Sequence, residues 1–394
     1  MKLVFVHDHV FYTDGEGCYY TSGKLPYSVW ERYLSVFEQI TVVARAKKLT
    51  NLDDVSKLNL SSGLNVSFVE MPSLSNPKNI VTKRQQVIKK MKEIILENDA
   101  VIARVPSELG LLAAKIALKV NKPWAVEVVA HAWDALWNYG NIQGKIYAPI
   151  LYWRTREIVK KSKFSLYVTK KFLQSKYPSY GYQINCSNVE LPNVPEEVLV
   201  QRLQREVSDK YTIGLIGSLN SNYKGIDTAL KAIQLIRNIV PNIELRILGD
   251  GSKDLWLNLA SNLDVLQNVR FDGVLPGGDA VFNWLDNLDL YIHPSRQEGL
   301  PRALIEAMSR GLPALGSTVA GIPELLEEQC LHSPNDYKKL ANLIECSLDI
   351  NWREEQSRKN FLTAKDYTKE VLDNRRRLFL EELRGFASTL KSNR

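Results

Sequence analysis

Hydrophobic and polar positions along the chain alternate between short apolar runs and longer segments with helical spacing. Short β-branched and aromatic runs predict buried strands at 3–6, 40–44, 66–69, 99–103 and 124–129. Between them, apolar residues three or four positions apart predict helices from Pro26 to Phe37 and over 80–96, and residues 9–23 are expected to form a loop. This alternation indicates a parallel sheet with helices on both faces.

The same alternation starts again in the second half of the chain. Strands are expected at 212–217, 243–248, 269–271 and 288–292, with helices at 227–239 and 301–310. Residues 187–208 include Leu191-Pro192-Asn193-Val194-Pro195 and a charged stretch, which indicates a linker. Two doubly wound units in series predict a ligand cleft near the carboxyl ends of the strands.

Length, composition and charge limit the class of protein. A chain of 394 residues with 45% apolar and 24% charged residues fits two globular domains. No apolar run reaches the ~20 residues that span a bilayer, and the first residues are too short for a signal peptide, so we expect a cytoplasmic protein. Residues 1–195 carry 26 Lys and Arg against 16 Asp and Glu, whereas the remainder carries 25 against 28. The basic half predicts an acidic partner, lipid phosphates or nucleic acid, with simple solvated charge as the alternative.

The sequence motifs of disulfide-linked, metal-binding and nucleotide-cofactor proteins are absent or incomplete in this chain. The four cysteines form no Cys-x-x-Cys pair and are expected to be free thiols in a reducing compartment. His7 and His9 could chelate a metal, but no third ligand is evident, so no metal site is expected. The chain lacks Gly-x-Gly-x-x-Gly after its first strand and has no P-loop motif, which argues against nicotinamide and P-loop chemistry.

Residues 294–308 are the most informative stretch, with the pattern of a strand end, a loop and a helix. Pro301 is expected at the first helical position, and Leu300 before it is a poor N-cap, so the first helical N–H groups form a ready anion site. Glu298 lies just outside this helix and Glu306 about one and a half turns inside it, so their carboxylates should point to different places. The alternative is that both merely complement the helix dipole.

Glu298 and Glu306 have the spacing of the Glu-x7-Glu motif, and the segment resembles family-four glycosyltransferases, retaining enzymes of the GT-B fold. Further segments resemble the family in the expected order: Gly217-Ser218-Leu219, Lys224-Gly225-Ile226-Asp227, Leu248-Gly249-Asp250-Gly251, Phe271-Asp272-Gly273, Gly311-Leu312-Pro313 and Ala320-Gly321-Ile322-Pro323-Glu324. The resemblance is strong over residues 211–330 and weaker before them. It implies an α/β protein with two Rossmann-like domains facing a central cleft: an acceptor domain over 1–197, a donor domain over 205–372, and a last helix at about 373–394 that crosses back.

The resemblance also assigns roles on the donor side. Glu298 would hold the donor sugar, the backbone N–H groups of Gly299 and Leu300 the diphosphate, Glu306 the ribose, and Lys224 the charge of the departing phosphate. Other donor-side positions would be Gly217, Ser218, Gly249, Gly273, Val274 and Pro301. Ser218 departs from the family, which often has Arg there. Lys224 is therefore expected to act with the helix dipole and with Arg296 or Arg302.

In the first half, His131 follows a predicted strand and resembles the family's histidine beside the anomeric carbon. The alternatives are a histidine that only anchors its loop, and Asp134 in its place. Ser22-Gly23 resembles a degraded version of the family's Gly-Gly loop on the acceptor side, with an ordinary turn as the alternative.

The resemblance implies metal-independent, retaining transfer of a sugar from a UDP- or GDP-sugar to a saccharide or lipid-linked saccharide. The process would be the biosynthesis of a surface polysaccharide such as lipopolysaccharide or capsule, on the inner face of the cytoplasmic membrane. No cofactor beyond the donor and no nucleic acid are expected, and an anionic membrane surface is an expected partner. The alternatives are a sugar-nucleotide epimerase of the same fold and a non-catalytic sugar- or polyanion-binding protein.

Overall fold

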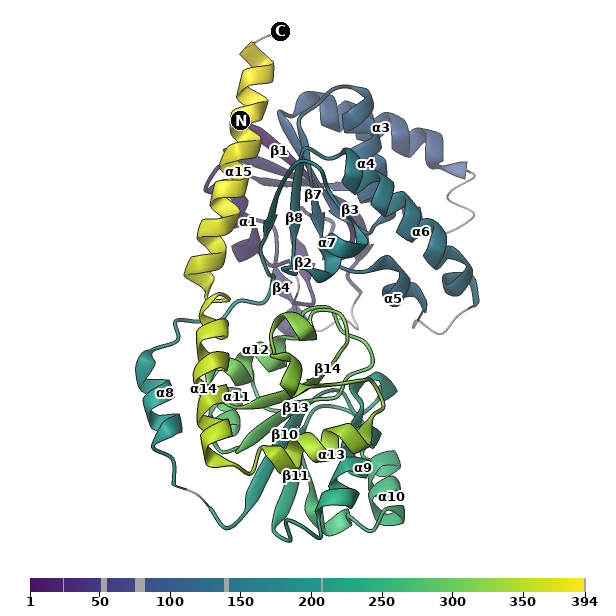
Figure 1. Cartoon of the computed structure of the whole chain (residues 1–394). Helices are drawn as coiled ribbons and strands as arrows, with labels where there is room; N and C mark the ends of the chain where they lie inside the picture. The colour runs from purple at the N-terminus through teal and green to yellow at the C-terminus, as the bar shows by residue number, and fades with distance from the viewer. Residues whose placement is uncertain (24, 51–54, 75–81, 138–141, 207, 393–394) are drawn as a thin grey trace. The chain divides into compact units, whose positions relative to one another are not determined.

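The computed structural model describes the chain apart from residues 24, 51–54, 75–81, 138–141, 207 and 393–394, and apart from the side chains of residues 134, 135 and 137. The chain forms two compact units. The first comprises Met1–Cys186 and Asp373–Arg394, and the second comprises Ser187–Leu372. Each has a sheet flanked by helices (Figure 1).

The strands of the first unit are β1 (Lys2–Thr13), β2 (Tyr19–Thr21), β3 (Gln39–Lys48), β4 (Asn59–Leu60), β5 (Val66–Glu70), β6 (Ala100–Val105), β7 (Trp124–Val128), β8 (Phe164–Tyr167) and β9 (Tyr182–Asn185). Its helices are α1 (Tyr27–Leu34), α3 (Arg84–Glu97), α4 (Glu108–Lys119), α5 (Ala132–Trp137), α6 (Ile142–Lys161), α7 (Phe172–Lys176) and most of α15 (Lys369–Ser392), with a 3-10 turn at Val55–Lys57. Parallel pairing gives the order β5-β3-β1-β6-β7-β8-β9.

Alternation along β1 shows how this sheet is covered on both faces. Val4 and Val6 belong to the core that includes α3 and α4, whereas Phe5 packs edge-on against Trp30 of α1, with ring centroids 5.1 Å apart. Successive side chains of β1 thus pack against the helices on opposite faces of the sheet.

The expected loop over residues 9–23 is wrong over part of its length. After a register shift between Val6 and Val10, β1 continues through Thr13 beside β3, and Tyr19–Thr21 pairs with it as antiparallel β2. The pairing with β3 supplies hydrogen bonds that the local sequence pattern does not reveal.

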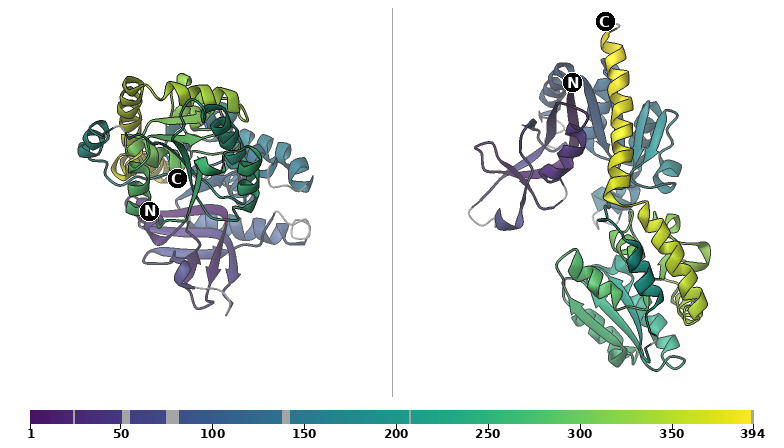
Figure 2. Two further views of the ribbon diagram at one scale, coloured as in Figure 1. Left: turned by 90° about the horizontal axis from the view of Figure 1, so that it is seen from below. Right: turned by 90° about the vertical axis from the view of Figure 1, so that its left-hand side faces the viewer.

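The end of the chain belongs to the first unit. From Asp373 onward, α15 lies along the side of that unit's sheet (Figures 1 and 2). Phe386 packs on Phe164 of β8 with ring centroids 5.5 Å apart, and Lys391 pairs with Asp99 at 3.0 Å.

The strands of the second unit are β10 (Tyr211–Ile216), β11 (Ile243–Leu248), β12 (Val269–Gly273), β13 (Leu290–His293), β14 (Ala314–Ser317) and β15 (Leu331–His332). Its helices are α8 (Glu196–Leu203), α9 (Ile226–Ile236), α10 (Asp254–Asn262), α11 (Asp279–Asp286), α12 (Arg302–Ser309), α13 (Tyr337–Cys346) and α14 (Ile350–Lys365), with 3-10 turns at Asn222–Lys224, Leu266–Asn268, Ile322–Glu324 and Glu328–Cys330. The order is β12-β11-β10-β13-β14-β15, all parallel. This is the Rossmann order, and it reverses between β10 and β13.

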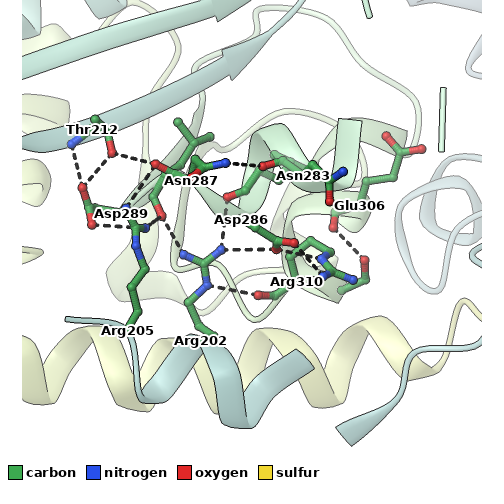
Figure 3. A network of polar contacts seen from close by, with 12 residues as sticks. Arg202, Arg205, Thr212, Asn283, Asp286, Asn287, Asp289, Glu306 and Arg310 are labelled. Atoms are coloured by element: carbon green, nitrogen blue, oxygen red, sulfur yellow. Dashed lines mark hydrogen bonds and ion pairs between the residues drawn. The ribbon is translucent and has the colours of Figure 1, made fainter. Parts of the chain in front are cut away.

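Residues 187–204, interpreted above as part of a linker, belong to the second unit and contain α8. Figure 3 shows the contacts that hold this helix: the Arg202 guanidinium donates to the carbonyls of Leu285 and Leu288 at 3.1 and 2.6 Å. Asp286 in turn receives two hydrogen bonds from Arg310, directly after α12 (Figure 3). Arg202, one of the charged residues of this stretch, therefore anchors α8 to the second unit.

Candidate active site

Two loops meet where the strand order of the second unit reverses. One follows β10 and contains Lys224, and the other follows β13 and contains Glu298. The loops touch closely, because a Cβ atom built on Gly225 (φ 73°) would lie 2.1 Å from the Pro294 carbonyl oxygen. In open parallel sheets ligands bind at this point of reversal.

Lys224 and Glu298 form an ion pair across these loops. The Lys224 Nζ lies 2.5 Å from the Glu298 Oε1, and both side chains are mostly buried. Gly217 makes room for the lysine, because a Cβ atom at that position would lie 2.8 Å from the Lys224 Cγ. The lysine charge is therefore held in one place by a carboxylate 74 residues away.

The same carboxylate oxygen accepts two further hydrogen bonds. His293 Nε2 lies 2.9 Å and Ser295 Oγ 3.0 Å from the Glu298 Oε1. Burial alone would raise the pKa of Glu298, but the hydrogen bond and charge of His293 and the charge of Lys224 outweigh it and lower the pKa to about 2. Glu298 is thus an anion throughout the neutral range, suited to anchoring and accepting hydrogen bonds rather than to donating a proton.

His293 is a site residue that the sequence interpretation missed. It is the buried last residue of β13, and its Nδ1 lies 3.2 Å from the Tyr291 hydroxyl. A usable signal was present, because polar residues at the carboxyl ends of central parallel strands are well placed for chemistry. His293 meets this criterion as well as His131 does, since it ends the central strand β13.

The start of α12 carries no side-chain cap among the described residues. Pro301, expected to be the first helical residue, is instead the N-cap, because its ψ of 113° is extended. The loop before it is held by Gly321, whose N–H donates to the Gly299 carbonyl at 3.0 Å. A Cβ atom on Gly299 would meet no described atom within 4 Å, so the backbone beside these N–H groups is open. Such a helix start can bind an anion.

Glu306 lies in a different environment from Glu298. Its side chain is largely buried within α12, and burial raises its pKa, partly offset by the charge of Arg302, whose NH1 lies 3.8 Å from the Glu306 Oε1. The two carboxylates thus have separate partners. A ligand group that donates a hydrogen bond would stabilise the ionised form of Glu306.

Among the described residues, neither arginine proposed as a second cation contacts Lys224. Arg296 donates to Asp227 at 2.5 Å and to Thr228 at 3.3 Å, and it also bonds the Asn222 carbonyl and Asn335. Arg302 is exposed, and its NH1 lies 3.8 Å from the Glu306 Oε1. Arg296 therefore holds the loop that carries Lys224.

The glycine turns lie at the carboxyl ends of β10, β11 and β12. A Cβ atom on Gly249 would lie 1.9 Å from the Gly217 carbonyl oxygen, and the Gly249 N–H donates to the Gly273 carbonyl at 2.7 Å. Ser218 has its hydroxyl 3.5 Å from the Asp250 carbonyl, and Val274 after Gly273 is exposed. Close backbone packing explains the glycine at 249.

The acceptor-side candidates belong to the first unit. His131 directly precedes α5, and its ring contacts those of Tyr152, Phe172 and Tyr177 at centroid distances of 5.5, 5.7 and 5.9 Å. Ser22 and Gly23 are exposed after β2, and Gly23 has a φ of 113°. Asp134 is in α5, but its side chain lies outside the described residues.

His7 and His9, the candidate metal ligands, have contacts of a structural kind. Burial, assisted by the charge of Arg104, lowers the pKa of His7, and His9 Nε2 lies 2.8 Å from the Thr21 hydroxyl. Within the described part of the chain, no group of three or more His, Cys, Asp or Glu residues is placed to hold a metal ion. All four cysteines are free, as expected. No described helix is both long and apolar enough to cross a bilayer.

Comparison with known proteins shows the family and the fold of the chain. Residues 210–349, which contain all the donor-side candidates, match the family described as glycosyl transferases group 1. The chain is 36% identical to protein CapJ of Staphylococcus aureus over 375 residues, covering 94% of this chain and 92% of CapJ. The structure of HepE from Anabaena in complex with UDP superposes with a TM-score of 0.62 at 15% identity, covering 100% of both chains. WaaG, a glycosyltransferase involved in lipopolysaccharide biosynthesis, gives 0.58 at 15% identity over 97% of this chain and 99% of its own. The GT-B fold expected from the sequence is confirmed.

Proposed function

Because the chain belongs to the group 1 glycosyl transferases, we propose that it transfers a sugar with retained configuration from a UDP- or GDP-sugar to a saccharide or lipid-linked saccharide. The process would be the assembly of a bacterial surface polysaccharide. The observation that carries this proposal is the Lys224–Glu298 pair beside the uncapped start of α12, at the reversal of a Rossmann sheet.

In the proposed reaction an acceptor oxygen attacks the anomeric carbon while the bond from that carbon to the diphosphate oxygen breaks. The acceptor proton passes to the departing diphosphate oxygen, so atoms and charges balance. Lys224 and the N–H groups of α12 stabilise the charge that grows on the diphosphate. Glu298 accepts hydrogen bonds from the donor sugar and fixes Lys224, and Glu306 binds the ribose. His131, Ser22 and Gly23 are proposed for the acceptor side on the family resemblance.

The test is a thermal-shift panel of UDP-, GDP- and dTDP-sugars, since a ligand that binds only the folded state raises its apparent stability. Turnover is then measured with the stabilising donor, with and without a saccharide acceptor. Sugar transfer that requires the acceptor supports the proposal. Conversion of the donor alone would indicate an epimerase, and binding without any turnover would indicate a non-catalytic sugar-binding protein.

The proposed charge stabilisation uses Lys224 and helix N–H groups, so we expect activity to survive EDTA. Divalent ions should then act only by general screening. Complete loss of activity on chelation, restored by one specific ion, would contradict the metal-independent mechanism.

A further inference from the structure

A small cavity lies in the second unit between helices α8 and α14, and its volume is about 60 Å³. Asp289 and Pro313 line it, and these residues directly precede β13 and β14, whereas Glu298 follows β13. Because the strands of this sheet are parallel, the cavity and the candidate active site lie at opposite ends of the strands. The other lining residues are Arg202, Leu203, Arg205, Glu206, Ile350, Arg353, Glu354 and Ser357.

Two guanidinium groups line one side of this cavity. Arg202 and Arg205, both labelled in Figure 3, donate to the same Leu288 carbonyl oxygen, Arg202 at 2.6 Å. Two positive charges are therefore held close together, and the side chain of Arg202 is only 7% exposed. Burial and the charge of Arg205 lower the pKa of Arg202 to about 10. A negative group in the cavity would offset this repulsion, because it favours the charged form of the arginine.

The acidic side chains beside this pair are already engaged. Asp289 accepts two hydrogen bonds from Thr212, both at 2.7 Å, in addition to its ion pair with Arg205 at 3.3 Å. Asp286 lies 3.7 Å from Arg202, but its oxygens accept hydrogen bonds at 2.8 and 2.7 Å from the arginine directly after α12. Arg202 therefore has less negative charge beside it than a full ion pair would supply.

Arg353 on α14 supplies the third guanidinium group of the lining. Its guanidinium lies over the Tyr211 ring at 5.5 Å. Among the described residues, its buried Nε has no hydrogen-bond partner. Buried polar groups normally have a partner, so this donor marks a place where a ligand or water belongs. Ser357, four residues further along α14, lines the same cavity and is buried.

We propose that this cavity binds a phosphate group, either that of inorganic phosphate or that of a small phosphomonoester. Its three guanidinium groups can donate to phosphate oxygens, and the planar fork of arginine matches the geometry of this anion. A volume of about 60 Å³ has room for roughly four to six water-sized groups, which accommodates the oxygens of one phosphate. The bound anion would tie α8 to α14.

Two glutamates in the lining oppose an anion and limit its affinity. Glu354 lies 4.0 Å from Arg358, which partly neutralises it. Glu206 is exposed and has no ion pair with any residue that the structure describes. With Arg202 and Arg353 both short of acidic partners, positive charge still exceeds negative charge in the lining. This site is separate from the candidate donor site, so it goes beyond the sugar transfer proposed above.

The test is calorimetric titration of the full chain with inorganic phosphate and with glycerol 3-phosphate, at an ionic strength held constant with sodium chloride. Arg353→Gln should weaken binding by about tenfold or more, because a charged hydrogen bond to the phosphate is lost. The matched control Arg237→Gln, which removes the same charge elsewhere in the second unit, should bind like the wild type. Lys224→Met, which alters the candidate donor site, should leave this binding unchanged.

Glu206→Gln alters an exposed residue, so it tests the cavity even if Arg353→Gln does not fold. It should tighten phosphate binding severalfold, because it removes a negative charge from the lining. Tighter binding of inorganic phosphate than of glycerol 3-phosphate would identify free phosphate as the ligand, and the reverse order would identify a monoester.

Three results would overturn the inference. The first is the absence of saturable binding of both ligands, which would leave the cavity to water. The second is an unchanged affinity in folded Arg353→Gln or in Glu206→Gln. The third is loss of the binding in Lys224→Met instead, which would place the phosphate at the donor site.

Discussion

Helices α4 and α12 occupy matching places in the two units, and their first turns differ. Each follows the strand just beyond the central strand at which the order reverses, β6 beside β1 and β13 beside β10. Side chains of the protein itself cap the first N–H groups of α4. Ser107 Oγ accepts from the Gly110 N–H at 3.0 Å, and the Asp8 carboxylate accepts from the Leu109 N–H at 3.2 Å. Among the described residues, no side chain caps α12.

The difference teaches that topology alone does not create an anion site. Both units present a helix start at the reversal of a parallel sheet, where the helix dipole favours negative charge. In the first unit Asp8, carried by β1, already supplies that charge. In the second unit the start of α12 stays open, and β10 leads instead to Lys224. This difference supports the proposal that the donor diphosphate binds at the start of α12.

The largest expected effect comes from removing the cation beside α12. Lys224→Met keeps the stem length and deletes the charge, so kcat should fall on the order of 10²–10³-fold with a much smaller change in KM. Arg296 should not compensate, because it is bound to Asp227 and Thr228. Steady-state kinetics on the folded variant is the measurement. A kcat within a few-fold of the wild type would show that the leaving-group site lies elsewhere.

Glu298→Gln should lower the stability of the second unit. The pKa of Glu298 is lowered from 4.5 to about 2 in the folded protein, so its contribution is present above pH 4.5 and is lost as the pH falls through about 2. The corresponding free energy of unfolding is at most about 3 kcal/mol. Denaturant unfolding of wild type and variant between pH 7 and pH 2 is the measurement. The difference between their free energies of unfolding should shrink as the pH falls. A stability difference that is independent of pH would contradict the ion-pair assignment.

Glu306→Gln is expected to act on ligand binding instead. Loss of a charged hydrogen bond to the ribose should weaken nucleotide affinity by about tenfold. Since burial raises the pKa of Glu306, its removal should not destabilise the unliganded fold. Glu298→Gln should impair sugar transfer more than nucleotide affinity. Calorimetric titration of both variants with free nucleotide is the comparison, and equal losses of affinity would refute the division of roles.

The smallest effects test the capping difference itself. Ser107→Ala should cost about 1 kcal/mol of unfolding free energy in the first unit and leave nucleotide affinity unchanged. Pro301→Ser would give α12 the cap it lacks, and should add several tenths of a kcal/mol while weakening donor binding a few-fold, because the new hydroxyl competes for the same N–H groups. Thermal melts and nucleotide titrations measure both. Donor binding that is insensitive to Pro301→Ser would argue against α12 as the diphosphate site.

Local pattern in the sequence was sufficient for the α/β class and much of the donor loop. The alternation of strands and helices predicted two series of elements, and the poor capping residue Leu300 predicted an open helix start, although the N-cap proved to be Pro301. These features depend on neighbours within one or two turns, so they can be read along the chain. The extension of β1 to Thr13 could not be predicted in this way, because its hydrogen bonds are made with β3, which is distant in the sequence.

Only the tertiary structure decided which charged groups meet. Lys224 and Glu298 are 74 residues apart, and Asp8 reaches a helix 101 residues away, because the order of the strands brings their loops together. The same packing brings His293 within hydrogen-bond distance of the Glu298 carboxylate. It also pairs Arg296 with Asp227, so that Arg296 holds the loop that carries Lys224. Residue type and spacing determine what each side chain can do. Which partner it finds depends on sheet order and close backbone approach, and these are properties of the folded chain.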